Sequence, residues 1–224
     1  MPTILLVRHA QASFGSVDYD VLSELGERQA GALGRELRRR GSPADVLRCG
    51  THRRQRDTVK AFGDRTPDVD PGLDEYDSDG ILATHARSPL RLHAAGPVAD
   101  PSAASRAFQL VLDAGLRSWI DAGAASRAPE SYPAFATRVQ ASLDDAAGRL
   151  SSGQTAVLCT SGGVISAACV HLLGVSEAAF LAFNRVAVNA GITTIAVGRS
   201  GQSLVSFNEH GHLQTGNGSL VSYR

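Results

Sequence analysis

Short apolar runs along the chain predict strands. The run from Thr3 to Val7 is rich in leucine and β-branched residues and ends abruptly in charged residues, which is typical of a strand buried inside a parallel sheet. Similar runs recur further along the chain. We expect strands at residues 3–7, 44–49, 155–159, 190–197 and 203–207, the last two joined by a turn at 199–201.

Helical periodicity fills most of the segments between these strands. The clearest helix begins at Ser23 and ends near Arg40, where Gly41 is a suitable stop. Five prolines punctuate residues 66–101, so we expect mostly loops there. The helices that we expect span residues 23–40, 52–62, 102–122, 131–150 and 164–173.

Strands that alternate with helices favour an α/β protein, a three-layer α/β/α sandwich with a mostly parallel central sheet. The 224 residues are an ordinary length for one such domain, so we expect a single domain over 1–224. A helix with a proline-rich lead-in, at about 81–133, is a candidate lid insertion, although a plain packing role fits it equally well.

The charge balance, the short apolar N-terminal run and the few cysteines argue against several classes of protein. Acidic and basic residues balance at 22 each, so nothing predicts bulk attraction to nucleic acid or to an anionic membrane. The apolar run at the N-terminus is too short for a signal peptide or a membrane span, and we expect a cytoplasmic protein. Cys49, Cys159 and Cys169 lack the spacing of a disulfide framework or a metal site, so we expect buried thiols and neither metal nor cofactor.

Polar residues follow three of the predicted strands. They are Arg8-His9, the cluster from Thr51 to Arg56, and Thr160 to Gly163. In open α/β sheets, binding sites lie beyond the carboxyl ends of the strands, so these three groups are expected to meet. Guanidinium groups match the oxygens of a phosphate, and a neutral imidazole beside them can attack phosphorus if an acceptor fixes its tautomer.

Ordered motifs along the chain resemble those of the histidine phosphatase superfamily, the phosphoglycerate-mutase-like proteins. The matching segments are Leu6-Val-Arg-His-Ala10 (R-H-G), Leu22 to Ala30 (L-[ST]-x-x-G-x-x-Q-A), Cys49 to Thr58 (S-S-P-L-x-R-A-x-x-T, in its arginine and threonine), Leu73-Asp-Glu75 (L-x-E) and Asn208 to Leu213 (N-x-x-x-H-L). Together they cover essentially the whole chain in the order of the family.

The resemblance implies a role for each matching residue. It implies that His9 is the nucleophile, that Arg8 and Arg54 bind the phosphoryl group, and that Glu75 is the acid/base carboxylate. Ser161 and the N–H groups near Gly162 and Gly163 would bind a phosphate oxygen at the start of a helix. Two residues of the loop after the first strand are further candidates for substrate contact, namely Gln11 and Ser13.

The chain departs from the family pattern at three places. Ala10 replaces the glycine after the histidine, and the W-E-G that often follows L-x-E is missing. The third strand end reads Thr-Ser-Gly-Gly where the family has S-H-G-G, so Ser161 replaces a second pocket histidine. Losing one donor of this kind typically costs about 10²–10³ in rate, so a slow enzyme is expected unless another group replaces it. Other histidines of the chain that could take the place of the missing one are His52, His85, His210 and His212, although no motif selects any of them for that role.

The sequence thus favours a phosphatase that hydrolyses phosphomonoesters through a phosphohistidine, of metal-independent, acid type. Its substrate would be a small phosphorylated molecule or a phosphorylated protein, and homo-oligomerisation is left open. A non-catalytic phosphate-binding module remains an alternative. A mutase is disfavoured by the acidic Tyr-Asp-Ser-Asp after Glu75, and a serine hydrolase by the lack of the glycine that G-x-S-x-G requires before Ser161.

Overall fold

A six-stranded sheet forms the centre of the protein. The computed structural model describes residues 1–13, 19–42, 44–85, 101–215 and 218–223. The strand order is β3-β2-β4-β1-β5-β6, and β7 and β8 form a separate two-stranded sheet. The strands are β1 Thr3–Arg8, β2 Val46–Cys49, β3 Asp68–Val69, β4 Thr155–Thr160, β5 Ile192–Gly198, β6 Gly201–Glu209, β7 Gln214–Thr215 and β8 Gly218–Ser219.

The parallel part of the sheet sets up the site. β1 pairs with β4 in parallel, β4 with β2, and β2 with β3. β5 is antiparallel to β1 and to β6, so the sheet is mixed but mostly parallel, as expected. In this register Arg8 lies opposite Thr160, and Cys49 lies opposite Cys159, so the ends of β1, β2 and β4 meet at one edge.

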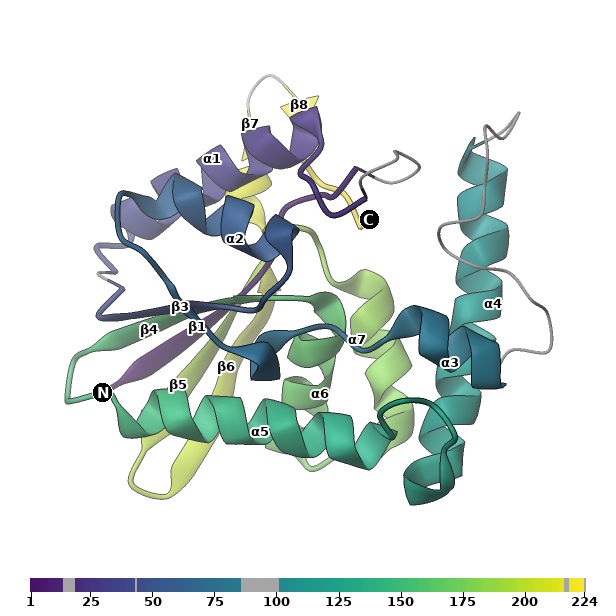
Figure 1. Ribbon diagram of the computed structural model, residues 1–224. Helices are drawn as coiled ribbons and strands as arrows, with labels where there is room; N and C mark the ends of the chain where they lie inside the picture. The colour runs from purple at the N-terminus through teal and green to yellow at the C-terminus, as the bar shows by residue number, and fades with distance from the viewer. Residues whose placement is uncertain (14–18, 43, 86–100, 216–217, 224) are drawn as a thin grey trace.

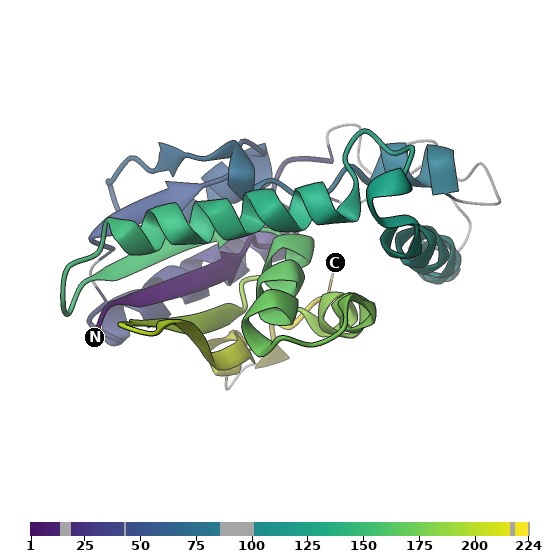
Figure 2. The ribbon, with the colours of Figure 1, turned by 90° about the horizontal axis from the view of Figure 1, so that it is seen from below.

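Helices cover both faces of the sheet (Figure 1). They are α1 Glu24–Arg39, α2 Arg53–Val59, α3 Ser78–His85, α4 Pro101–Ala122, α5 Tyr132–Gly148, α6 Gly162–Leu173 and α7 Phe180–Val186, with short 3₁₀ segments at Lys60–Phe62, Pro71–Leu73, Gly123–Ala125, Glu177–Ala179 and Gly211–Leu213. α1 and α2 lie on one face and α5 and α6 on the other, which confirms the three-layer prediction (Figures 1 and 2).

The core divides into two clusters because successive strand residues point to opposite faces. Leu5 and Val7 of β1 pack with Leu33 of α1 in one cluster. Ile4 and Leu6 belong to the other, with the residues of α5 and α6. A strand that is buried on both faces reads as a continuous apolar run, which is why β1 is recognisable in the sequence.

Two residues at the start of α1, Ser23 and Gly26, determine how the loop after β1 packs against the helix. Ser23 caps the helix, because its Oγ accepts a hydrogen bond from the Gly26 amide at 3.0 Å. Gly26 also lets the loop pass close by, since a Cβ at this position would lie 2.1 Å from the Gln11 carbonyl oxygen. The helix predicted at 23–40 is therefore confirmed, with Ser23 as its cap.

Five of the described helices and strands were not predicted from the sequence, namely β3, α3, α7, β7 and β8. The region 66–101 was expected to be mostly loop, yet its described part holds β3 and α3. α3 begins where the Asp77 side chain accepts a hydrogen bond from the Gly80 amide at 2.9 Å. These elements are short, so packing rather than periodicity determines them.

Two helices lie beyond the carboxyl end of the parallel strands. Both views place α3 and α4 there, side by side (Figures 1 and 2). Their buried apolar residues, among them Leu82 and Trp119, belong to the same core cluster as those of α5 and α6. Residues 86–100 of the candidate lid fall outside the described part of the structure, so the role of 81–133 as a lid stays a prediction. No helix among the described residues is long and apolar enough to cross a membrane.

Candidate active site

His9 lies at the carboxyl end of β1 and is buried, with 5% of its surface exposed. Its Nδ1 lies 2.8 Å from the Ala10 carbonyl oxygen, which can only accept, so Nδ1 carries the proton. Nε2 accepts a hydrogen bond from Arg54 Nε at 3.1 Å. These two contacts fix a neutral imidazole with its lone pair on Nε2, and the acceptor that the sequence analysis required is the backbone of the next residue.

The charge environment of His9 also favours the neutral form. Burial holds the pKa of His9 well below its ordinary value, and the nearby positive charges of Arg54 and Arg8 lower this pKa further. The ring is therefore unprotonated at neutral pH, as a nitrogen nucleophile must be.

The backbone around His9 is held by side chains from other elements. The Ala10 amide donates to Thr58 Oγ1 at 3.0 Å, and this hydroxyl donates to the Arg54 carbonyl at 2.7 Å. Asn189 donates to the His9 carbonyl at 3.2 Å. Thr58 is the threonine of the R-A-x-x-T-like motif, so the spacing of that motif reflects a contact between α2 and the end of β1.

Arg54 lies in the first turn of α2 with 8% of its surface exposed. Its Nη1 donates to Asp20 Oδ1 at 2.7 Å, and the other oxygen of Asp20 accepts from the Arg53 amide at 2.6 Å. Among the described residues, Arg54 Nη2 makes no hydrogen bond or ion pair. The contacts thus orient the guanidinium beside His9 and leave Nη2 available to an anion.

Arg8 approaches the same region from the other side of β1. Its Nη1 donates to the carbonyl oxygens of Ala187 and Tyr223, the latter at 3.0 Å. Its Nε lies 3.5 Å from the position that a Cβ on Gly162 would occupy. The side chain therefore places its charge beside the start of α6, between β1 and the C-terminal segment.

Glu75 reaches the start of α6 from the segment that follows Pro71–Leu73. Its Oε2 accepts from the Gly163 amide at 3.1 Å, and its Oε1 accepts from the Tyr76 amide at 3.3 Å. Burial raises the pKa of Glu75, and these hydrogen bonds and the charges of Arg54 and Arg8 only partly oppose the effect. A carboxyl that keeps its proton to higher pH is suited to act as a general acid.

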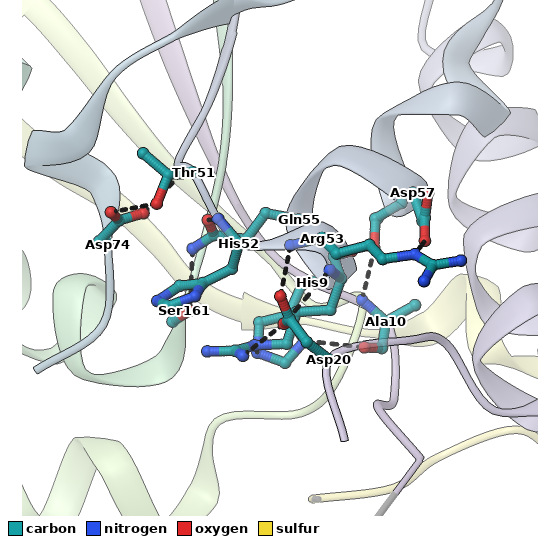
Figure 3. Close-up of polar contacts among 12 residues, drawn as sticks. His9, Ala10, Asp20, Thr51, His52, Arg53, Gln55, Asp57, Asp74 and Ser161 are labelled. Atoms are coloured by element: carbon teal, nitrogen blue, oxygen red, sulfur yellow. Dashed lines mark hydrogen bonds and ion pairs between the residues drawn. The ribbon is translucent and has the colours of Figure 1, made fainter. Parts of the chain in front are cut away.

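Ser161 is the residue before α6, and its side chain is fully buried. Its Oγ accepts a hydrogen bond from Gln55 Nε2 at 3.0 Å (Figure 3). The Gly163 amide, which the sequence analysis offered to a phosphate oxygen, is engaged by Glu75. One of the donors expected at this helix start, the Gly163 amide, therefore has a partner within the protein, whereas the Ser161 hydroxyl accepts from Gln55 and keeps its own proton to donate.

The remaining candidates lie at the edge of the site or away from it. Gln11 Oε1 accepts from the Ser23 hydroxyl at 2.8 Å, and the Ser13 amide donates to the Val21 carbonyl at 2.8 Å, so both belong to the loop between β1 and α1. Three of the histidines have partners elsewhere, namely His85 (the hydroxyls of Ser118 and Ser126), His210 (the Asn208 carbonyl) and His212 (the Ala190 carbonyl).

Sequence reasoning missed Asp20 and Gln55. Asp20 lies in a polar loop where no spacing distinguishes it from its neighbours, and its role depends on contact with Arg54, 34 residues away. Gln55 lies inside the arginine-rich cluster and bonds to Ser161, 106 residues away. Its position one residue after Arg54, on the inner face of α2, is the signal that could have identified it.

Comparison with known proteins agrees with this geometry. The family model of the histidine phosphatase superfamily (branch 1) matches residues 4–87 and 102–210. No curated protein is similar enough to count as a match. Among the residues that the structure describes, no group of three or more His, Cys, Asp or Glu side chains is placed to hold a metal ion.

Solved structures share the fold over nearly their whole length. Phosphoserine phosphatase from Entamoeba histolytica, in complex with 3-phosphoglyceric acid, has a TM-score of 0.68 at 18% identity, over 95% of this chain and 100% of that one. YhfR of Bacillus stearothermophilus has a TM-score of 0.67 at 16% identity, and the match covers 95% of this chain and 99% of that one. Mycobacterial glucosyl-3-phosphoglycerate phosphatase in complex with VO₃ has a TM-score of 0.61 at 25% identity, and the match covers 93% of this chain and 99% of that one. With the family model matched on both sides of residues 88–101, the chain belongs to the histidine phosphatase superfamily.

Proposed function

We propose that this protein is a phosphatase that hydrolyses phosphomonoesters through a phosphohistidine on His9. The observation that carries the proposal is the neutral His9 ring with its Nε2 lone pair directed at Arg54, whose Nη2 has no hydrogen-bond partner among the described residues. The phosphatases among the similar structures, which act on phosphoserine or glucosyl-3-phosphoglycerate by their names, support the same reaction class.

In the first half-reaction Arg54 and Arg8 bind the phosphoryl oxygens and balance their negative charge. His9 Nε2 attacks phosphorus as the bond to the leaving oxygen breaks. Glu75, protonated at that moment, gives its proton to the leaving oxygen, so the alcohol departs neutral. The directions of the two pKa shifts support these roles, since the raised pKa of Glu75 favours a protonated acid and the lowered pKa of His9 favours a neutral nucleophile.

In the second half-reaction Glu75 is ionised and takes a proton from water. The water oxygen attacks phosphorus, the bond between phosphorus and Nε2 breaks, and inorganic phosphate leaves. His9 and Glu75 then regain their starting forms. The guanidinium groups supply the positive charge that a cation supplies in other phosphatases, so we propose that turnover continues after treatment with a chelator.

Ser161 affects both the expected turnover rate and the alternative that the protein is a non-catalytic phosphate-binding module. Its Oγ is buried and bonded to Gln55, so it offers at most its own proton to a phosphate oxygen. If no other group compensates, turnover is slow, and in the limit the protein binds phosphate without hydrolysing it. We infer a phosphatase rather than such a module because the Glu75 carboxyl, which binding alone does not need, is in place beside the start of α6.

A His9→Ala variant tests the proposal with p-nitrophenyl phosphate as substrate. We expect turnover to fall to the background rate while circular dichroism and the melting temperature show a folded protein. His171, exposed at the end of α6, provides a matched control, because His171→Ala should keep full activity. Undiminished turnover by the His9→Ala variant rules out the proposal, and phosphate binding without turnover in the wild type favours the non-catalytic module.

A further inference from the structure

On the side of β4, the described part of the site presents the small hydroxyl of Ser161 in place of a longer side-chain donor. Arg54 and Arg8 approach His9 from α2 and β1, whereas the residue at the end of β4 on the opposite side is Ser161. Its hydroxyl is fully buried and accepts a hydrogen bond from Gln55. A phosphoryl group has three non-bridging oxygens, and one of them needs a donor on this side.

His52 lies next to this position although it belongs to a different element. It is the residue before α2, with an extended backbone, and it is half-buried. The His52 amide donates to Gln55 Oε1 at 3.3 Å, while Gln55 Nε2 donates to Ser161 Oγ at 3.0 Å. One amide side chain thus joins the backbone of His52 to the hydroxyl of Ser161, and Figure 3 shows the imidazole extending from the start of α2 toward Ser161.

The charges around His9 include His52. The positive charges that lower the pKa of His9 are those of Arg54, Arg8 and His52, in that order. Among the described histidines, His85, His210 and His212 are bonded elsewhere, and His171 is exposed at the end of α6. His52 is therefore the second imidazole of the site within the described part of the chain.

We propose that the His52 imidazole donates a hydrogen bond to a non-bridging oxygen of the phosphoryl group on the Ser161 side of the site, and so is a catalytic residue. This inference rests on the proposed phosphatase function. It means that the imidazole comes from the start of α2 rather than from the end of β4, and that Ser161 makes room for it. Turnover then need not be slow in spite of the serine.

The surroundings of His52 suit a donor. Burial lowers the pKa of His52, and the charge of Arg54 lowers it further, while Asp74 and Asp20 oppose these effects and Arg138 adds to them. A bound phosphate dianion would favour the protonated ring. A neutral imidazole also carries one N–H, so the ring can donate in either form.

The first test compares His52→Ala and His52→Gln with the control His171→Ala. The hydrogen bond from the His52 amide to Gln55 Oε1 uses the backbone, so both variants leave it intact. They do remove the half of the capping box in which the His52 side chain accepts from the Gln55 backbone, so the melting temperature of each variant is measured to check that α2 remains folded. We expect His52→Ala to lower kcat/KM for p-nitrophenyl phosphate by about 10²–10³-fold, as is usual for the loss of one preorganised donor. We expect an intermediate loss for His52→Gln and none for the control. Activity of His52→Ala within threefold of the wild type overturns the proposal.

A second test moves the imidazole from one element to the other. The double variant His52→Ala with Ser161→His should regain at least tenfold over His52→Ala alone, because the vacated space receives a ring that serves the same oxygen. A double variant that melts like the wild type but is no more active than His52→Ala contradicts the claim that both positions serve one oxygen.

Calorimetric binding of inorganic phosphate separates this proposal from the proposed function. If the wild type binds phosphate but does not turn over substrate, the phosphatase proposal fails, while a loss of affinity of tenfold or more in His52→Ala still supports the contact. If the wild type turns over substrate and His52→Ala matches it in both rate and phosphate affinity, the phosphatase stands and the role of His52 is wrong.

Discussion

Arg54 Nε donates a hydrogen bond to His9 Nε2 over 3.1 Å, so the guanidinium lies at the nitrogen that we propose as nucleophile. Asp20 holds Nη1 of the same group at 2.7 Å. A planar guanidinium can donate in both directions at once and still present Nη2 to an anion. A single side chain therefore orients the imidazole and, in the proposed function, also binds the phosphoryl group.

The first prediction concerns the shape of this group rather than its charge. Lysine keeps the positive charge but cannot donate to His9 and Asp20 from fixed positions, so we expect Arg54→Lys to lower kcat/KM by about 10²-fold or more. Steady-state kinetics with p-nitrophenyl phosphate measure the loss. Arg56→Lys, an exposed residue on the same helix, should have no effect. Equal activity of the two variants would mean that charge alone is required of Arg54.

The second prediction concerns pH. The pKa of His9 is lowered, so the active neutral ring persists below pH 6.5, and the acid limb of kcat/KM should lie below that value. The pKa of Glu75 is raised, so the protonated acid persists above pH 4.5, and the alkaline limb should lie above that value. A pH–rate profile should therefore be bell-shaped, with an acid limb set by His9 and an alkaline limb set by Glu75. A rate that keeps rising above pH 8 is incompatible with Glu75 as the acid.

The third prediction uses the close packing around Glu75. A Cβ on Gly163 would lie 2.1 Å from Glu75 Oε1 and 2.6 Å from the Tyr76 ring, so Gly163→Ala must displace the carboxyl. We expect kcat to fall by about 10²-fold, the lower end of what a general acid contributes. Gly148→Ala at the end of α5 is the matched control, since a Cβ there meets nothing within 4 Å. If both variants have wild-type kcat, the position of Glu75 does not matter for the reaction.

Much of this site can be predicted from the sequence because its parts follow strands. β1 and β4 are buried on both faces and read as apolar runs, so the polar residues after them, His9 and Ser161, stand out. The motif spacing also selects Arg54 among four arginines between 48 and 56. The fold class follows from the alternation of strands and helices, and Ser23 marks the start of α1.

Other parts of the site cannot be predicted in this way because they depend on tertiary contacts. The pairing of Asp20 with Arg54 and that of Gln55 with Ser161 join residues far apart in the chain, and neither carries a periodic signal. The eight residues of α3 have little amphipathic pattern, and packing against α4 accounts for the helix. Apolar periodicity also does not encode strand direction, so the antiparallel pairing of β5 required the structure.

The fourth prediction links Glu75 to stability. Its pKa is raised in the folded protein, so the folded state binds the proton more tightly than the unfolded state does. The stability that this proton provides is present below the unfolded pKa and is lost as pH rises through the folded pKa. Glu75→Gln should therefore raise the melting temperature near pH 8, by about 2–4 °C for each kcal/mol gained, and the gain should vanish below about pH 4.

The same variant should lose turnover, since glutamine cannot give a proton to the leaving oxygen. A Glu75→Gln protein that is less stable than the wild type at pH 8 would show that the ionised carboxylate is favourably bound, contrary to the pKa direction. Thermal melts at several pH values, monitored by circular dichroism, distinguish the two cases.

The phosphoenzyme itself tests the central claim most directly. Glu75→Gln protein should be mixed with p-nitrophenyl phosphate, because p-nitrophenolate can leave without a proton from Glu75, whereas the hydrolysis of the phosphohistidine still lacks its base. The reaction should be quenched rapidly in alkali, where phosphohistidine survives, and the protein digested for mass spectrometry. The account predicts one phosphate on the peptide that carries His9, stable in alkali and lost in acid, and none in the Glu75→Gln, His9→Ala double variant. A wild-type enzyme that releases phosphate while no phosphate is ever trapped on His9, or a phosphate trapped on Ser161 instead, would contradict it.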